Sequence, residues 1–308
     1  MKKTLPIAIV VLVIGGIFSL FQKSLWSAKN ADAEKITEPI ATKTDELAND
    51  SLASAKDPEP IPVSEPKLPQ PSEEKTSTKD SPIDPKAVSY PSEILDLSNW
   101  KQTLPTGASK KPAEIKQGAL ATFSDKTCFH PNNASDGVVF RAPVNGVTTS
   151  NSGYPRSELR EMTDKGASLA SWSTTSGTHS LFIDQAITAV PKNKKHIVAG
   201  QIHDANDDVI VVRLEYPKLF IDINGEEGPT LDSNYTLGKR FTVKFVAQGG
   251  MIRVYYNGNE RPAYTLKKKI SGCYFKAGAY TQSNCSKESD CSSSNYGEVI
   301  IYKLAVQH

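Results

Sequence analysis

The stretch Val209-Ile-Val-Val-Arg-Leu-Glu-Tyr-Pro-Lys-Leu-Phe-Ile-Asp-Ile-Asn-Gly225 decides the fold class of this chain. Its first half is rich in β-branched residues, which favour strands. In its second half Leu219, Ile221 and Ile223 occupy every second position before the turn pair Asn224-Gly225. Alternation of this kind that ends at Asn-Gly is typical of strands joined by tight hairpin turns.

The same pattern continues towards the C-terminus. Apolar residues alternate with polar ones over 241–245 and again over 252–256, where a second Asn-Gly pair follows at 257–258. Residues 299–304 form one more apolar run, and the region shows no amphipathic helical stretch longer than a turn or two. Many short strands with polar turns predict an all-β fold, a β-sandwich or jelly roll.

Composition divides the 308 residues into three parts. Residues 34–86 contain no Gly, Cys, Phe, Tyr or Trp but hold nine of the twenty prolines. Such a segment buries too little apolar surface to offset the entropy of ordering it, so we predict a disordered Pro/Ser/Thr/Glu/Lys-rich tether. Residues 87–308 remain as one domain with enough chain for a substantial core.

The N-terminal part, 1–33, has the features of an export signal. Lys2 and Lys3 precede an apolar run at 6–21, and Ala31-Asp-Ala33 offers a cleavage site. The run is also close to the minimum length for spanning a bilayer, so an uncleaved anchor that tethers the protein to the membrane is the alternative. Either way we expect a protein that is secreted, or anchored to the membrane facing the periplasm or the outside.

The four cysteines all fall in the predicted domain, and none forms a CxxC metal motif. In an oxidising compartment they permit three disulfide pairings. We favour Cys285–Cys291, which would close a short polar loop, together with Cys128–Cys273 as a longer clasp.

Charge limits the ligand class only weakly. Residues 87–308 contain 25 basic and 21 acidic side chains, a mild excess that suits an acidic ligand. The dense Lys/Arg clusters of a nucleic-acid-binding protein are absent from the sequence, so we expect no nucleic-acid partner.

Three segments place polar side chains at every second position, where strand geometry puts them on one face. They are Arg156-Ser-Glu-Leu-Arg160, Gln201-Ile-His203 and Tyr274-Phe-Lys-Ala-Gly-Ala-Tyr-Thr-Gln282. Their alternate positions, such as Leu159, Ile202 and Phe275, look directed to the core. A sheet face that is polar and aromatic, with Gly278 leaving room between large side chains, indicates a saccharide groove.

These three segments, in this order and at this spacing, resemble the signature segments of the alginate lyases of polysaccharide lyase family 7. The opening of the domain, Leu95-Asp-Leu-Ser-Asn-Trp-Lys-Gln-Thr-Leu-Pro105, is similar to the first strand of that family. The resemblance covers nearly all of 87–308. It implies a jelly-roll β-sandwich whose concave sheet binds alginate, an acidic polysaccharide, with no cofactor. We also expect a monomer.

The resemblance implies roles for the matched residues in a β-elimination at C5 of a uronate. The catalytic residues expected are Arg156, Gln201, His203 and Tyr280. The first two would neutralise the substrate carboxylate, and the last two would act as base and acid. The residues expected to bind or orient the substrate are Asn151, Glu158, Arg160, Lys276 and Gln282. Family members with Ile at the position of Ile202 tend to cut guluronate-containing blocks.

Two other functions remain open at this point. A glycoside hydrolase would need a carboxylate pair such as Glu158 and Glu161, but an odd spacing directs these two to opposite faces of a strand. A non-catalytic carbohydrate-binding module would leave the pairing of His203 with Tyr280 unexplained. The acidic residues 204, 207 and 208 lack the ligand pattern of a calcium loop, so we expect no metal there.

Overall fold

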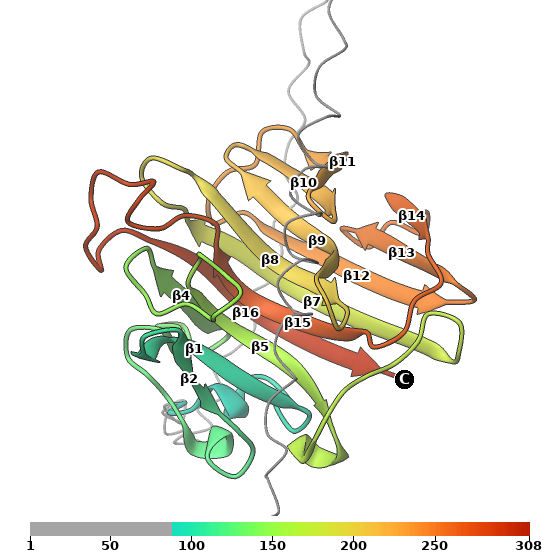
Figure 1. The fold of residues 1–308 in the computed structure, drawn as a ribbon, viewed down its shortest axis with the longest axis horizontal. Helices are drawn as coiled ribbons and strands as arrows, with labels where there is room; N and C mark the ends of the chain where they lie inside the picture. Colours follow the sequence, from blue (N-terminus) through green and yellow to red (C-terminus); the bar gives the residue numbers. More distant parts are fainter. Residues whose placement is uncertain (1–87) are drawn as a thin grey trace, which may run out of the picture. The chain divides into compact units, whose positions relative to one another are not determined.

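The computed structural model describes residues 88–308, and these form two antiparallel β-sheets packed face to face (Figure 1). The predicted signal segment, 1–33, and tether, 34–86, lie outside the described residues. Within 88–308 the helices are three single 3-10 turns, η1 (Pro91–Glu93), η2 (Leu120–Thr122) and η3 (Asp164–Gly166). None of these is long and apolar enough to cross a membrane. The predicted all-β sandwich is confirmed.

The first sheet has nine strands and carries the groove described below. In spatial order they are β11 (Glu226–Asp232), β10 (Lys218–Ile223), β9 (Asp208–Glu215), β8 (His196–His203), β15 (Tyr274–Thr281), β5 (Arg156–Thr163), β1 (Trp100–Ala108) and β2 (Lys111–Ile115), with β6 (Ser168–Leu169) paired to β5. The stretch 209–225 forms β9, β10 and the turn after them, with Leu219 opposite Leu214.

The second sheet has seven strands. In spatial order they are β14 (Tyr264–Lys267), β13 (Met251–Tyr256), β12 (Arg240–Gln248), β7 (Thr178–Ala189), β16 (Tyr296–Gln307), β4 (Val138–Pro143) and β3 (Phe129–Pro131). Strands adjacent in space are often far apart in sequence, as with β15 between β8 and β5 in the first sheet. The three polar segments are therefore brought together only by the finished sandwich.

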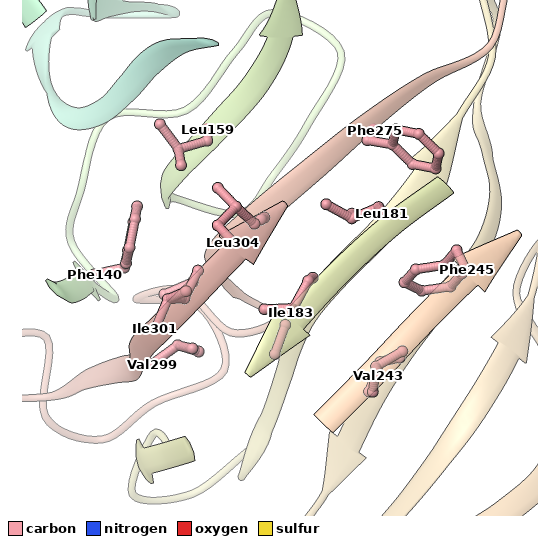
Figure 2. Close-up of a cluster of buried hydrophobic side chains, with 14 of the residues drawn as sticks. Phe140, Leu159, Leu181, Ile183, Val243, Phe245, Phe275, Val299, Ile301 and Leu304 are labelled. Atoms are coloured by element: carbon pink, nitrogen blue, oxygen red, sulfur yellow. The ribbon is translucent and has the colours of Figure 1, made fainter. Parts of the chain in front are cut away.

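The core lies between the two sheets and takes one face from each of them (Figure 2). Leu159 and Phe275 of the first sheet meet Ile183, Phe245 and other side chains of the second, and all of these are fully buried. Burial of a side chain of this size stabilises the fold by about 1.5–3 kcal/mol relative to exposure. Leu159, Ile202 and Phe275 take the core side predicted for them, so their neighbours along each strand must face outward.

Gly278 has a different role from the one predicted. Its φ of +133° lies in the region that favours glycine, and a Cβ there would lie 2.6 Å from the carbonyl oxygen of Ser157 and 2.9 Å from the ring of Phe140. Gly278 also falls within the register shift between β15 and β8. The glycine therefore allows β15 to approach β5 closely, and it does not serve to open space in the groove.

The disulfide prediction is half right. Cys285 and Cys291 are bonded and close the short loop before β16, but Cys128 and Cys273 are both free and buried. The carbonyl of Cys128 accepts a hydrogen bond from Ser157, which stands opposite Ala279. Cys273 precedes Ala279 by six residues along an extended strand, which places it about 20 Å away. A disulfide needs Cα atoms within about 7 Å, so the predicted clasp cannot form.

We expect thiol labelling to show this pairing. Burial raises the pKa of the Cys128 and Cys273 thiols to about 12, so both should resist maleimide in the native protein. After denaturation without reductant two thiols per chain should react, and after reduction four, as counted by intact mass. No reactive thiol in the unreduced, denatured chain would show that Cys128 and Cys273 are paired after all.

Candidate active site

Strands β8, β15 and β5 lie side by side and align the polar segments across the first sheet. Lys276 stands opposite Gln201 on one side and Arg160 on the other, while Tyr280 stands opposite Arg156. Directly opposed residues of antiparallel strands project to the same face. The face holds a groove of about 360 Å³. The predicted residues that line it are Asn151, Arg156, Arg160, Gln201, His203, Lys276 and Tyr280.

Beneath the groove, the carboxylate of Glu158 binds three of these side chains. Its Oε2 atom lies 3.1 Å from Nη1 of Arg156 and 2.6 Å from Nζ of Lys276, and its Oε1 accepts a hydrogen bond from Nε2 of Gln201. Glu158 is only 1% exposed. A buried carboxylate without partners would cost several kcal/mol, so this cluster depends on all three donors.

The charges in this cluster shift each other's protonation. Burial alone would raise the pKa of Glu158, but the charges of Lys276 and Arg156, with the hydrogen bonds from Lys276 and Gln201, hold that pKa below its ordinary value. Burial lowers the pKa of Lys276 to about 8, helped by the neighbouring Arg156 and opposed by Glu158. At neutral pH the cluster therefore holds one anion and two cations, and the excess positive charge faces the groove.

His203 is held as a neutral ring with one free nitrogen. Its Nδ1 lies 2.6 Å from the carbonyl oxygen of Asp204, and because a carbonyl only accepts, Nδ1 carries the hydrogen. The ring stacks on Tyr274 with a centroid distance of 5.1 Å. Within residues 88–308 the other nitrogen, Nε2, makes no hydrogen bond. Burial lowers the pKa of His203, so this nitrogen is available as a proton acceptor at neutral pH.

Tyr280 lines the same groove as His203 and lies between a hydroxyl and a cation. Its phenol oxygen is 2.8 Å from Oγ of Ser152, and the guanidinium of Arg156 lies 3.8 Å from the centre of its ring. Ser152 is fixed in turn by the backbone of Tyr154. A phenol with a hydroxyl partner can pass a proton on, and the cation beside it stabilises negative charge that develops in the groove.

The two arginines of β5 have different partners. Arg160 does not contact Glu158; it donates to the carbonyls of Glu161 and Ala170 and lies 4.0 Å from the centre of the Tyr274 ring. Glu158 therefore orients one arginine, Arg156, and supports the substrate-binding face from below.

Gln282 lies beyond the end of β15, is 7% exposed and does not line the groove. Its predicted contact with substrate stays a prediction.

The groove also uses residues that were given no role at the sequence level. Tyr274 falls on the predicted face and holds both His203 and Arg160. Ser152 comes from the loop before β5, and its partnership with Tyr280 joins residues that are 128 positions apart. Lys101 and Glu114, 2.6 Å apart, reach one wall from β1 and β2. The strand period could have identified Tyr274. The contacts of Ser152, Lys101 and Glu114 depend on how distant segments of the chain come together, which no local sequence pattern encodes.

Known proteins share this arrangement of sheets. Residues 95–308 match the protein family described as Alginate lyase. The chain belongs to polysaccharide lyase family 7. The crystal structure of the alginate lyase from Corynebacterium sp. superposes with a TM-score of 0.69 at 54% identity and covers 71% of this chain and 98% of that one. Alginate lyase AlgAT5 of the same family is 55% identical, with a TM-score of 0.67 and the same coverage.

A curated relative agrees with this assignment. The alginate lyase of Klebsiella pneumoniae is 28% identical over 290 residues, which cover 72% of this chain and 92% of that protein. The chain is therefore an alginate lyase, and the predicted jelly-roll fold class is confirmed. The two alternatives lose their support.

The hydrolase alternative also fails on geometry. Glu161 is fully buried on the core side of β5, where it accepts hydrogen bonds from the indole of Trp172 at 3.0 Å and from the backbone N–H of Phe275 at 2.8 Å. His308 lies 2.6 Å from its other oxygen. Glu161 therefore binds the segment around Trp172 and strand β15 on the core side. Its carboxylate cannot face a substrate together with Glu158.

The pH dependence of kcat/KM should report the ionisation of His203 and of Lys276. We predict that His203 acts as a base in its neutral form; because burial lowers its pKa, kcat/KM should fall with acid only below the range in which an ordinary histidine titrates. Lys276 loses its charge as the pH rises past about 8, and kcat/KM should fall there too. Lys276→Arg keeps a cation at every pH tested and should move the alkaline limb upward. An alkaline limb at the same pH in that variant would show that Lys276 does not cause it.

Proposed function

We propose that the lyase depolymerises alginate by β-elimination and favours guluronate-containing blocks. The observation that carries the proposal is the position of two proton-transfer groups, the free Nε2 of His203 and the hydroxyl of Tyr280, on one groove beside two cations. Elimination would remove the C5 proton of a uronate, cleave the 4-O-glycosidic bond and leave an unsaturated uronate at the new non-reducing end.

Neutralisation of the substrate carboxylate comes first in this reaction. Removing the C5 proton places a second negative charge next to that carboxylate, so donors must be aimed at it before the proton leaves. Arg156 gives Nη1 to Glu158, which leaves Nη2 of the same guanidinium for the substrate carboxylate. Gln201 gives one amide hydrogen to Glu158, and the second is left for the substrate.

Proton transfer divides between His203 and Tyr280 according to the sugar. In mannuronate the C5 proton and the O4 leaving group lie on the same side of the ring, and the Tyr280 hydroxyl can serve both. In guluronate they lie on opposite sides, so His203 takes the proton while Tyr280 protonates O4. Lys276 and Arg160 would bind the carboxylates of neighbouring sugars, and Asn151 would bind at the rim of the groove.

Solved complexes of a relative support these assignments. Family 7 alginate lyase A1-II′, 26% identical with a TM-score of 0.60, holds the product GGG in a variant with one Tyr-to-Phe change. A second variant, with His-to-Asn and Tyr-to-Phe changes, holds the substrate GGMG. A His and a Tyr were thus the residues replaced where an intact substrate was captured. We infer that the groove of this lyase binds alginate oligosaccharides in the same way.

The preference for guluronate rests on Ile202, and the structure limits how this residue can act. Ile202 is fully buried in the core, so its side chain cannot contact a sugar in the groove. Any influence on block preference must pass through its neighbours on β8, Gln201 and His203, whose positions depend on how the side chain beneath them packs. The preference would then be a matter of how far Nε2 of His203 lies from C5.

Replacing His203 and Tyr280 separately should distinguish removal of the C5 proton from protonation of O4. Tyr280→Phe removes the acid needed for either sugar, so cleavage of both block types should be abolished. His203→Asn removes the base and should slow guluronate cleavage by about 10²–10⁴ while sparing mannuronate more. Initial rates on purified blocks, followed by the ultraviolet absorbance of the C4=C5 double bond, measure this.

The control is Asn206→Ala, which changes an exposed residue at the rim of the same groove. It should leave the ratio of the two rates unchanged, and thermal melts should show all three variants folded. If His203→Asn slows both block types equally, the division is wrong and His203 is a further donor to the carboxylate.

A further inference from the structure

The outer face of the second sheet, on the opposite side of the sandwich from the groove, carries two adjoining hollows. One measures about 470 Å³ and the other about 210 Å³. Phe182 of β7 and Lys244 of β12 line both, so the hollows form one continuous surface. Tyr255 lies at the first hollow, and Lys303 and Ala305 lie at the second. We call this the β7–β12 surface.

Strand register places the central residues of the β7–β12 surface in one row. Tyr255 stands opposite Lys244, Lys244 opposite Phe182, and Phe182 opposite Ala305. Neighbouring strands are about 4.8 Å apart, so the row runs for about 14 Å across the sheet. The small side chain of Ala305 leaves the second hollow open beside the ring. A row of this length and shape fits several linked sugars lying across the strands.

Two aromatic rings in this row are only partly covered. Ser180 and Asp184 flank Phe182 on the outward face of β7. The alternation along the strand therefore predicts a polar residue at position 182, and the phenylalanine departs from it. Tyr255 is half-buried, and its hydroxyl makes no hydrogen bond within the described part of the chain. Aromatic faces pack against the C–H faces of pyranose rings, and a phenol at the edge can bond a sugar hydroxyl.

The cations of the β7–β12 surface lack anionic partners. Among residues 88–308, neither Lys244 nor Lys303 has a carboxylate within 4.0 Å, and both are exposed. The nearest acid along β7, Asp184, is already bound by Arg240 through two hydrogen bonds of 2.6 and 2.7 Å. Nζ of Lys303 lies 5.9 Å from the centre of the Phe182 ring. The two lysines therefore lie beside the partly exposed aromatic ring of Phe182.

We propose that the β7–β12 surface is a second, non-catalytic binding site for a strand of uronate polysaccharide. Alternating carboxylates and apolar sugar faces are the chemistry that lysines and aromatic rings in one row would recognise. The proposal rests on membership of an alginate lyase family and not on the roles given to His203 and Tyr280. A long polymer can reach both faces of the sandwich, whereas a short oligosaccharide in the groove cannot.

The test compares polymeric alginate with an alginate pentasaccharide in the full chain. One variant, Lys244→Gln/Lys303→Gln, removes the charges, and another, Phe182→Ala, removes the ring. The matched control, Lys126→Gln/Lys195→Gln, removes two exposed lysines that line neither the groove nor the hollows. Should Phe182→Ala melt early, Phe182→Leu replaces it.

We expect both variants to raise KM for the polymer roughly threefold or more, the scale of two exposed ion pairs or one aromatic contact. Turnover of the polymer, both constants for the pentasaccharide and the control should be unchanged. Retention in a native gel containing alginate, measured in a Tyr280→Phe background, should fall in the same two variants, whatever the outcome for the catalytic roles.

Three results would overturn the proposal. Unchanged KM and gel retention in both variants would show that the surface binds no polymer. An equal effect of the control pair, with none from Phe182→Ala, would reduce the effect to general attraction of a polyanion. An equal rise in KM for the pentasaccharide would place the cause in the groove or in the fold.

Discussion

The carboxylate of Glu158 fixes the groove more than any other single group. It lies beneath the sheet surface with an arginine, a lysine and an amide as its partners, and it is almost completely buried. Removing one member of such a cluster leaves an uncompensated charge, which is costly in the interior. The orientation of Gln201, the stacking of Arg156 on Tyr280 and the charge on Lys276 all depend on this one anion.

The same cluster explains why the groove suits an acidic ligand while the chain as a whole is almost neutral, with a formal net charge of +2. One carboxylate holds two cations close together, and burial at that point weakens the screening that water would provide. A single uronate carboxylate that enters the groove replaces water at donors already in place. The fold therefore concentrates a modest charge excess at the point where the reaction needs it.

Much of this could be predicted from the sequence because strands have a period of two. That period placed Arg156, Glu158 and Arg160 on one face and Leu159 on the other, and the structure agrees. The period does not place Gln282, since the strand ends one residue earlier at Thr281. It said nothing of Ser152 with Tyr280, or of Cys128 lying far from Cys273, because those distances follow from which strands pair.

The two faces of the sandwich carry different chemistry on the same kind of scaffold. The first sheet buries its acid and uses the cations that surround it, whereas the second keeps its lysines exposed beside Phe182. A rigid core between the sheets holds both faces without linking their side chains directly. Each face can therefore be altered alone, which makes the separate tests of the groove and of the β7–β12 surface meaningful.

A double-mutant cycle between Glu158 and Lys276 tests the central claim most directly. Glu158→Gln, Lys276→Met and the double variant would be unfolded in urea, with turnover on alginate measured alongside. We predict that each single change destabilises the protein by about 3 kcal/mol or more, that the double change costs much less than the sum, and that turnover is lost in all three. Additive free energies of unfolding, or Glu158→Gln with near-normal turnover, would contradict the account.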